Sequence, residues 1–220
     1  HKAFTGRSGT FFGYEGLGSI YWHMVSKLAL AVQECSLRAI RQGADAETTG
    51  RLLEHYYEIN AGIGVHKSPE LYGAFPTDPY SHTPKGKGVQ QPGMTGQVKE
   101  DILCHLGELG VFVQEGRLGF SPDMLRKSIF LQEARDFGYI DVEGEEKQLS
   151  IEKGALCFTF CQVPVVYRLS AEKRLEVHLK NGEKITFNGL QIDEARSAHV
   201  FQRTGEVVQV VVFVEENKLL

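Results

Sequence analysis

The sequence predicts an α+β protein with a helical first part and a β-rich second part. Two long runs with helical spacing of apolar residues precede residue 62, and a third follows residue 97. After Gly110 the apolar residues alternate in short runs that are separated by turn residues, and this period of two is that of strands. We therefore expect residues 1–122 to form a helical segment with a long Gly/Pro loop, and residues 123–220 to form a β-rich C-terminal domain.

The helical part is expected to begin with a hairpin of two helices. Ser19 can cap a first helix that runs to about Arg41. Most of the circumference of this helix is apolar, which predicts burial on several sides. Asp45 opens a second helix that closes before Gly62.

A long stretch rich in proline and glycine follows, from Asn60 to Gly93. Proline removes a backbone donor and glycine weakens regular structure, so no long helix is expected in this stretch. A loop of this length inside a compact domain is usually functional.

A third helix is expected directly after this loop, with Thr95 as its N-cap. Because Gly96 follows the cap, backbone N–H groups at the positive end of the helix dipole stay open, and a small anion can bind there. The alternative is a capped helix without a ligand. One face of the helix is expected to be buried through Val98, Ile102, Leu106 and Leu109.

The β-rich part shows several turn signals between short alternating runs. Glu115–Gly116 predicts a hairpin over residues 111–120, and Asn181–Gly182 is the strongest local hairpin signal. Many short strands at close spacing predict a β-sandwich-like domain. The strands are expected at Phe137–Val142, Ala155–Phe160, Val163–Leu169, Leu175–Leu179, Lys184–Phe187, Ala198–Gln202 and Val207–Val214.

Composition restricts the class of protein. The chain has 220 residues, is 42% hydrophobic and carries a formal net charge of -4, so it can build a core and is poorly suited to a nucleic-acid partner. No apolar run is long enough to cross a bilayer. The chain begins at His1 without an initiator Met, and we read it as a piece of a longer polypeptide.

The cysteines and histidines do not have the spacing of a metal site. Cys157 and Cys161 lie at an even offset in a strand-like run, where both would face the same way, and His partners are absent nearby. The histidines at positions 66, 82 and 105 lack helical metal-pair spacing. We expect no metal, and we interpret all four cysteines as buried free thiols in a reducing, cytoplasmic compartment.

Four short motifs, taken in order, resemble the C-terminal part of a known enzyme family. They lie at residues 18–23 (Gly-Ser-Ile-Tyr-Trp-His), 94–97 (Met-Thr-Gly-Gln), 109–113 and 117–122. This order is similar to that in the inverting disaccharide phosphorylases of the cellobiose and chitobiose phosphorylase family, and more loosely to maltose phosphorylases. The sequence departs from the family where Gln90, Gln91 and Pro92 replace tryptophans and where Gln97 replaces a serine.

The resemblance implies a fold and a set of binding residues. It implies the closing helices of an (α/α)6 toroid followed by a small β-rich domain. By the resemblance, His23, Thr95 and Gly96 bind inorganic phosphate, which is a co-substrate, and no other cofactor is expected. The family's general acid lies upstream of the matching region, so the catalytic residue belongs to the remainder of the parent polypeptide. The isolated chain is therefore expected to be inactive.

Other residues are candidates for contacts with a carbohydrate substrate. Tyr14 and Trp22 can stack on a pyranose ring, although aromatic residues at such positions are usually core. Glu15 and Asp78 can accept hydrogen bonds from sugar hydroxyls or brace their loops.

Two alternatives to a phosphorylase stay open. One is a hydrolase of the same architecture, in which Glu15 or Asp78 handles water. The other is a non-catalytic carbohydrate-binding or interaction module, in which the β-rich part binds the ligand.

Overall fold

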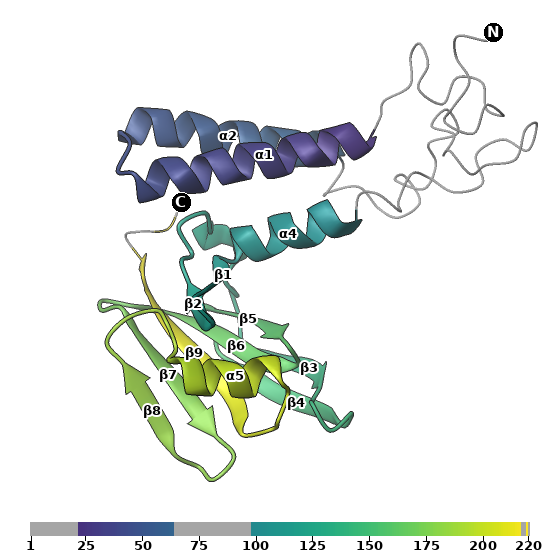
Figure 1. Cartoon of the computed structure of the whole chain (residues 1–220), viewed down its shortest axis with the longest axis vertical. Helices are drawn as coiled ribbons and strands as arrows, with labels where there is room; N and C mark the ends of the chain where they lie inside the picture. Colours follow the sequence, from purple (N-terminus) through teal and green to yellow (C-terminus); the bar gives the residue numbers. More distant parts are fainter. Residues whose placement is uncertain (1–21, 64–97, 217–218, 220) are drawn as a thin grey trace, which may run out of the picture. The chain divides into compact units, whose positions relative to one another are not determined.

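The computed structural model describes residues 22–63, 98–216 and 219 (Figure 1). These residues combine helices and strands, so the expected α+β class is confirmed. They divide into two compact units, one that ends at His105 and one that begins at Leu106. We call them the helical unit and the β-rich unit. Most of the expected Gly/Pro loop lies outside the described residues.

The helical unit contains an antiparallel hairpin of α1 (Trp22–Arg41) and α2 (Ala46–Ile63) (Figure 1). Gly43, with a φ of 68°, ends α1 at the expected place, and its N–H donates to the carbonyl of Ile40 at 3.1 Å. Asp45 caps α2 by accepting from the Thr48 N–H at 2.8 Å. The expected start of the first helix at Ser19 lies outside the described residues.

The second helix is longer than the sequence predicts. α2 continues through Gly62 to Ile63, whereas we expected it to close before Gly62. A single glycine disfavours a helix by only about 1 kcal/mol relative to alanine, so it does not have to end one.

The prediction that α1 is buried on several sides is wrong. Its buried positions form one stripe with helical spacing of three and four residues, and the apolar Leu28 is 52% exposed. The stripe is small and polar, because α1 packs along Ser26, Ala29, Gln33 and Ser36.

The predicted buried face of α4 (Val98–Glu108) is only partly confirmed, because Leu106 and Leu109 are half-buried but Ile102 is not. Ile102 and Leu103 are 54% and 50% exposed, while Glu100 and Cys104 are buried. The buried side is therefore set by the polar contact to α1 at Cys104 and not by the apolar spacing. The expected cap, Thr95, lies outside the described residues.

The β-rich unit is built on a five-stranded mixed sheet in the order β5-β6-β9-β7-β8 (Figure 1). The central strands β6 and β9 are parallel, and the other neighbours are antiparallel. The strands are β5 (Ala155–Phe160), β6 (Val163–Ser170), β7 (Arg174–Leu179), β8 (Lys184–Phe187) and β9 (Val207–Glu215).

Two hairpins, a short helix and a 3-10 turn accompany the sheet. They are β1–β2 (Val111–Gln114 and Arg117–Phe120), β3–β4 (Arg135–Ile140 and Glu146–Ile151), α5 (Glu194–Phe201) and η3 (Lys127–Ile129). In the part of the chain that the structure describes there is no second large sheet, so the predicted β-sandwich is wrong: two-stranded hairpins and a helix stand where a second sheet was expected.

Successive side chains of a strand point to opposite faces of the sheet, and each face packs in a separate hydrophobic core. Val165 and Tyr167 of β6 pack in the main core with Leu118 and Phe120 of β2. Val166, between them, packs in a smaller core that β3–β4 supplies. The tyrosine is fully buried, and its hydroxyl donates to the Leu109 carbonyl at 2.5 Å. The hairpin at residues 111–120 therefore belongs with the sheet.

The structure confirms most of the expected strands, but one of them is a helix. Both predicted hairpin turns are present, and Gly182 has a φ of 86°. Ala198–Gln202 was expected as a strand, but α5 occupies this segment because Asp193 caps it by accepting from the Arg196 N–H at 2.8 Å.

One strand, β4, was not predicted from the sequence. Its sequence is Glu-Lys-Gln-Leu-Ser-Ile, and Ile151 is the one buried residue in it. A strand that exposes most of its side chains carries little apolar alternation.

No described helix has the length and apolarity that crossing a bilayer requires.

Gly110 joins the end of α4 to β1 in a conformation that other residues tolerate poorly. Its φ is 73°, and a Cβ there would collide with the Ser121 carbonyl. Gly144, in the β3–β4 turn, has a similar φ of 84° but open space around it. A substitution at Gly144 therefore causes backbone strain alone, whereas one at Gly110 causes both strain and a steric collision.

We expect Gly144→Ala to lower the free energy of unfolding by about 1–2 kcal/mol, the cost of a left-handed backbone. Gly110→Ala should cost roughly 1–3 kcal/mol more, because the collision is added to the strain. Urea unfolding of both variants measures the difference. Equal costs would show that the chain passes Ser121 less closely than described.

Candidate functional site

The sequence-predicted site residues lie mostly outside the described residues. This applies to Tyr14, Glu15, Asp78, Thr95 and Gly96. The other two, Trp22 and His23, lie in the first turn of α1. The structure thus describes the helices that follow the two predicted phosphate motifs.

The helices α1 and α4 run in the same direction, and both begin at the same end of the helical unit (Figure 1). The Gln33 side-chain amide donates to the Cys104 carbonyl at 2.7 Å and so fixes their relative level. Gln33 follows Trp22 by eleven residues, and Cys104 follows Val98 by six. With a rise of about 1.5 Å per residue, the start of α1 lies only about 8 Å beyond the start of α4.

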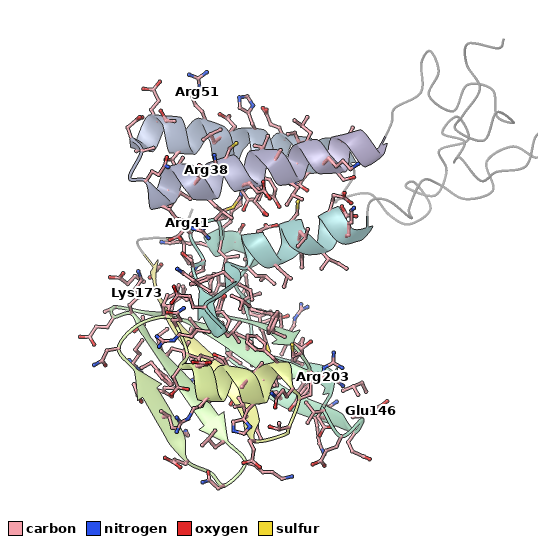
Figure 2. The ribbon with its side chains drawn as sticks, viewed as in Figure 1. Arg38, Arg41, Arg51, Glu146, Lys173 and Arg203 are labelled. Carbon is pink, nitrogen blue, oxygen red and sulfur yellow. The ribbon has the colours of Figure 1, made fainter. Side chains whose placement is uncertain are left out.

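Two helix starts at one end of a unit affect which ligands bind there. The start of an α-helix carries the positive end of the helix dipole, and its first backbone N–H groups have no acceptor within the helix. An anion or a polar ligand is favoured at such a place. Three arginines of the hairpin lie elsewhere: Figure 2 shows Arg38 and Arg41 of α1 and Arg51 of α2 toward the other end, near the turn between these helices. The exposed Lys27, in contrast, lies in the second turn of α1.

Gln33 is the buried polar centre of the helical unit. Its side chain is 2% exposed. Besides its bond to Cys104, its amide nitrogen donates to the Tyr56 hydroxyl at 3.2 Å. One amide therefore joins α1, α2 and α4. Sequence reasoning missed this role because Gln33 is only one of several polar positions on an otherwise apolar helix, and spacing does not show which of them is buried.

Glu100, in the first turn of α4, is the second buried polar residue that sequence reasoning missed. It is 3% exposed. Its Oε1 lies 3.7 Å from the exposed Lys99 Nζ, and its Oε2 has no hydrogen-bond partner among the described residues. The neighbouring Asp101 has a raised pKa, because of partial desolvation and because of repulsion by the Glu100 carboxylate. The start of α4 therefore concentrates negative charge near the predicted anion motif.

The cysteine prediction is only partly confirmed. All four thiols are free, but Cys35 is exposed and only Cys104 is buried. Cys157 packs in the smaller core, whereas Cys161 packs in the main core. The two side chains point to different cores because β5 ends before Cys161. Cys161 and Gln162, with φ values of 50° and 65°, form the turn that reverses the chain.

Neither thiol chemistry nor metal binding is indicated here. Burial raises the pKa of Cys157 to about 12, so this thiol is protonated at neutral pH. The described residues contain no group of three or more potential metal ligands.

The β-rich unit has a pocket of about 320 Å³ between the β3–β4 turn and the starts of β6 and β9. Such a volume lies at the small end of typical ligand sites. Its lining combines one aromatic ring, an apolar floor and a charged rim. The residues are Tyr139, Asp141, Val142, Glu143, Lys147, Gln162, Val163, Pro164, Lys180, Gly205, Val207 and Val208.

The charges on the rim of this pocket are paired. Lys180 donates to Glu143 at 3.0 Å, and Lys147 lies 3.6 Å from Asp141. The hydrogen bond to Glu143 raises the pKa of Lys180. Burial raises the pKa of Tyr139, so its hydroxyl stays a neutral donor. The four charges cancel, and the pocket favours an uncharged polar ligand.

Comparison with known proteins adds no relative. No family model matches the chain, and no curated protein matches it. The resemblance to disaccharide phosphorylases therefore rests on the four sequence motifs.

Loss of Gln33 should loosen the whole helical unit. Gln33→Ala removes the donor to Cys104 and leaves a cavity, and we expect it to lower the free energy of unfolding by about 2 kcal/mol. Glu34→Ala, one exposed position further on α1, is the matched control and should change it by less than about 0.5 kcal/mol. Native-state hydrogen exchange of the backbone amides in α1, α2 and α4 measures the loss of stability in both variants. Equal protection in the two variants would contradict the role of Gln33.

Proposed function

We propose that this chain is part of a carbohydrate-active enzyme that cleaves a glycosidic bond with phosphate. In this proposal α1, α2 and α4 are closing helices of an (α/α)6 toroid, and the β-rich unit is the C-terminal domain that follows it. The parallel course of α1 and α4, with their starts at one end of the helical unit, supports it most directly. The start of α1 overlaps the end of one predicted phosphate motif, and the start of α4 directly follows the other.

Phosphorolysis requires an anion held in line with the anomeric carbon while an acid protonates the leaving oxygen. His23, Thr95 and Gly96 are the proposed phosphate ligands. Tyr14 and Trp22 are proposed to stack on the sugar. Glu15 and Asp78 are proposed to bind its hydroxyls. The general acid comes from the remainder of the parent polypeptide, which operates in the cytoplasm.

Activity in the full-length protein should respond to phosphate through two distant residues. His23→Ala keeps helix propensity, and Thr95→Val keeps side-chain shape. Each removes one proposed anion contact and should raise the apparent Michaelis constant for phosphate roughly tenfold. The constant for the disaccharide should change less. Initial rates against phosphate at fixed cellobiose, chitobiose or maltose measure both constants.

Two results would contradict this proposal. Turnover that is independent of phosphate would favour the hydrolase, with water in place of the anion. Unchanged phosphate constants in both variants would show that the ligand lies elsewhere.

The pocket of the β-rich unit favours a second candidate function, the binding of an uncharged saccharide without catalysis. A tyrosine ring offers a stacking face, and the paired rim charges accept and donate hydrogen bonds without favouring an ion. Gln162 adds an amide at this rim; it is held by a bond from its Nε2 to the Asp141 carbonyl at 2.7 Å.

Tyr139→Leu should abolish most saccharide binding to this pocket and leave the rate of turnover unchanged. Phe137→Leu is the matched control. The ring of Phe137 stacks on that of Tyr139 in the same strand, with the ring centroids 6.1 Å apart, but Phe137 does not line the pocket. Titration calorimetry with cellobiose, in the full-length protein, measures the binding. If both variants bind as the wild type does, the pocket has no such ligand.

A further inference from the structure

Glu100 presents a physical problem that the described contacts do not solve. A buried carboxylate oxygen without a donor costs more than an ordinary missing hydrogen bond. Native proteins keep few such groups, and those that persist usually have a functional reason. In Glu100 the carboxylate is almost fully buried, and Oε2 has no partner among the described residues.

The direction of the side chain follows from helix geometry. In an α-helix the Cα–Cβ bond tilts toward the N-terminus, so Glu100, the third residue of α4, extends toward the start of this helix. Cys104, four residues later, lies on the same side of α4 and accepts from Gln33 of α1. The carboxylate therefore lies on the α1 side of α4, near the end where both helices begin.

Two other ways to satisfy this oxygen, a nearby cation and a metal ion, are disfavoured by the described surroundings. Lys99 is 77% exposed and approaches the other oxygen, Oε1, at 3.7 Å. A metal would need more ligands than the described residues gather anywhere. Oε2 therefore remains a buried acceptor that lacks a donor among the described residues.

We propose that Glu100 binds the carbohydrate substrate directly, with Oε2 accepting a hydrogen bond from a sugar hydroxyl at the shared start of α1 and α4. This inference rests on the proposed function, and it adds a specificity residue that no motif contains. A hydroxyl of an uncharged saccharide supplies the missing donor without adding charge. A buried acceptor of this kind also discriminates strongly against a sugar that lacks the hydroxyl.

The proposal predicts opposite effects of one substitution on stability and on binding. Glu100→Gln replaces a buried carboxyl group, whose Oε2 has no partner among the described residues, by a neutral amide, so the ligand-free protein should unfold at a temperature a few degrees higher. The same change removes a charged acceptor, and saccharide binding should weaken roughly ten- to a hundredfold. A carboxylate with a purely structural role would give lower stability and unchanged binding.

The experiment compares wild type, Glu100→Gln and Asp101→Asn in the full-length protein. Titration calorimetry with cellobiose, chitobiose and maltose gives the dissociation constants, and thermal unfolding without ligand gives the stability. Asp101→Asn removes one negative charge from the same helix turn at an exposed position, so its dissociation constant should equal that of the wild type.

Each contrary outcome identifies what has failed. If the wild type binds a saccharide and Glu100→Gln binds it equally well, Glu100 is not a substrate ligand. If binding is unchanged but turnover collapses, Glu100 acts on the reacting atoms and the binding role is overturned. If Glu100→Gln lowers the unfolding temperature, Oε2 has a structural partner. If the wild type binds none of the three sugars, the proposed function itself fails and the role of Glu100 falls with it.

Discussion

The hydrogen bonds of one buried amide determine how the helical unit is arranged. Gln33 donates to Tyr56 of α2 and to the backbone of α4 at Cys104, and its own side chain is almost completely buried. A buried amide is stable only when its partners are in place. It therefore specifies the level at which α1 and α4 lie side by side, which apolar contacts alone specify less strictly. The proposed ligand site depends on this level, because it brings the starts of two helices to one end.

The buried polar groups of α1 and α4 differ in whether they have hydrogen-bond partners, and a bound ligand would explain this difference. At Gln33 the buried polar groups are paired, which stabilises the contact. Toward the start of α4, Glu100 is buried with an unpaired oxygen. Proteins tolerate such local cost where a ligand supplies the missing partner. The β-rich unit shows the opposite arrangement, because the carboxylates of Asp141 and Glu143 are each paired with a lysine.

Much of the fold could be predicted from sequence, because strands and turns leave local signals. Asn181–Gly182 predicts its hairpin from backbone preference alone. The failures have physical causes. β4 exposes most of its side chains, so its alternation is weak, and α5 is set by the cap at Asp193 and not by its apolar content. The candidate site was less predictable. Gln33 bonds to a residue 71 positions away in the chain, and no local spacing encodes this contact or the burial of Glu100.

The central claim is that the motifs before α1 and α4 hold one ligand together. A double-mutant cycle of His23→Ala and Thr95→Val on the dissociation constant of inorganic phosphate tests it directly in the full-length protein. If both residues contact one phosphate, the cost of the double variant should differ from the sum of the single costs by roughly 1 kcal/mol. Costs that add within about 0.3–0.5 kcal/mol would show that the two residues act independently, and would contradict the account.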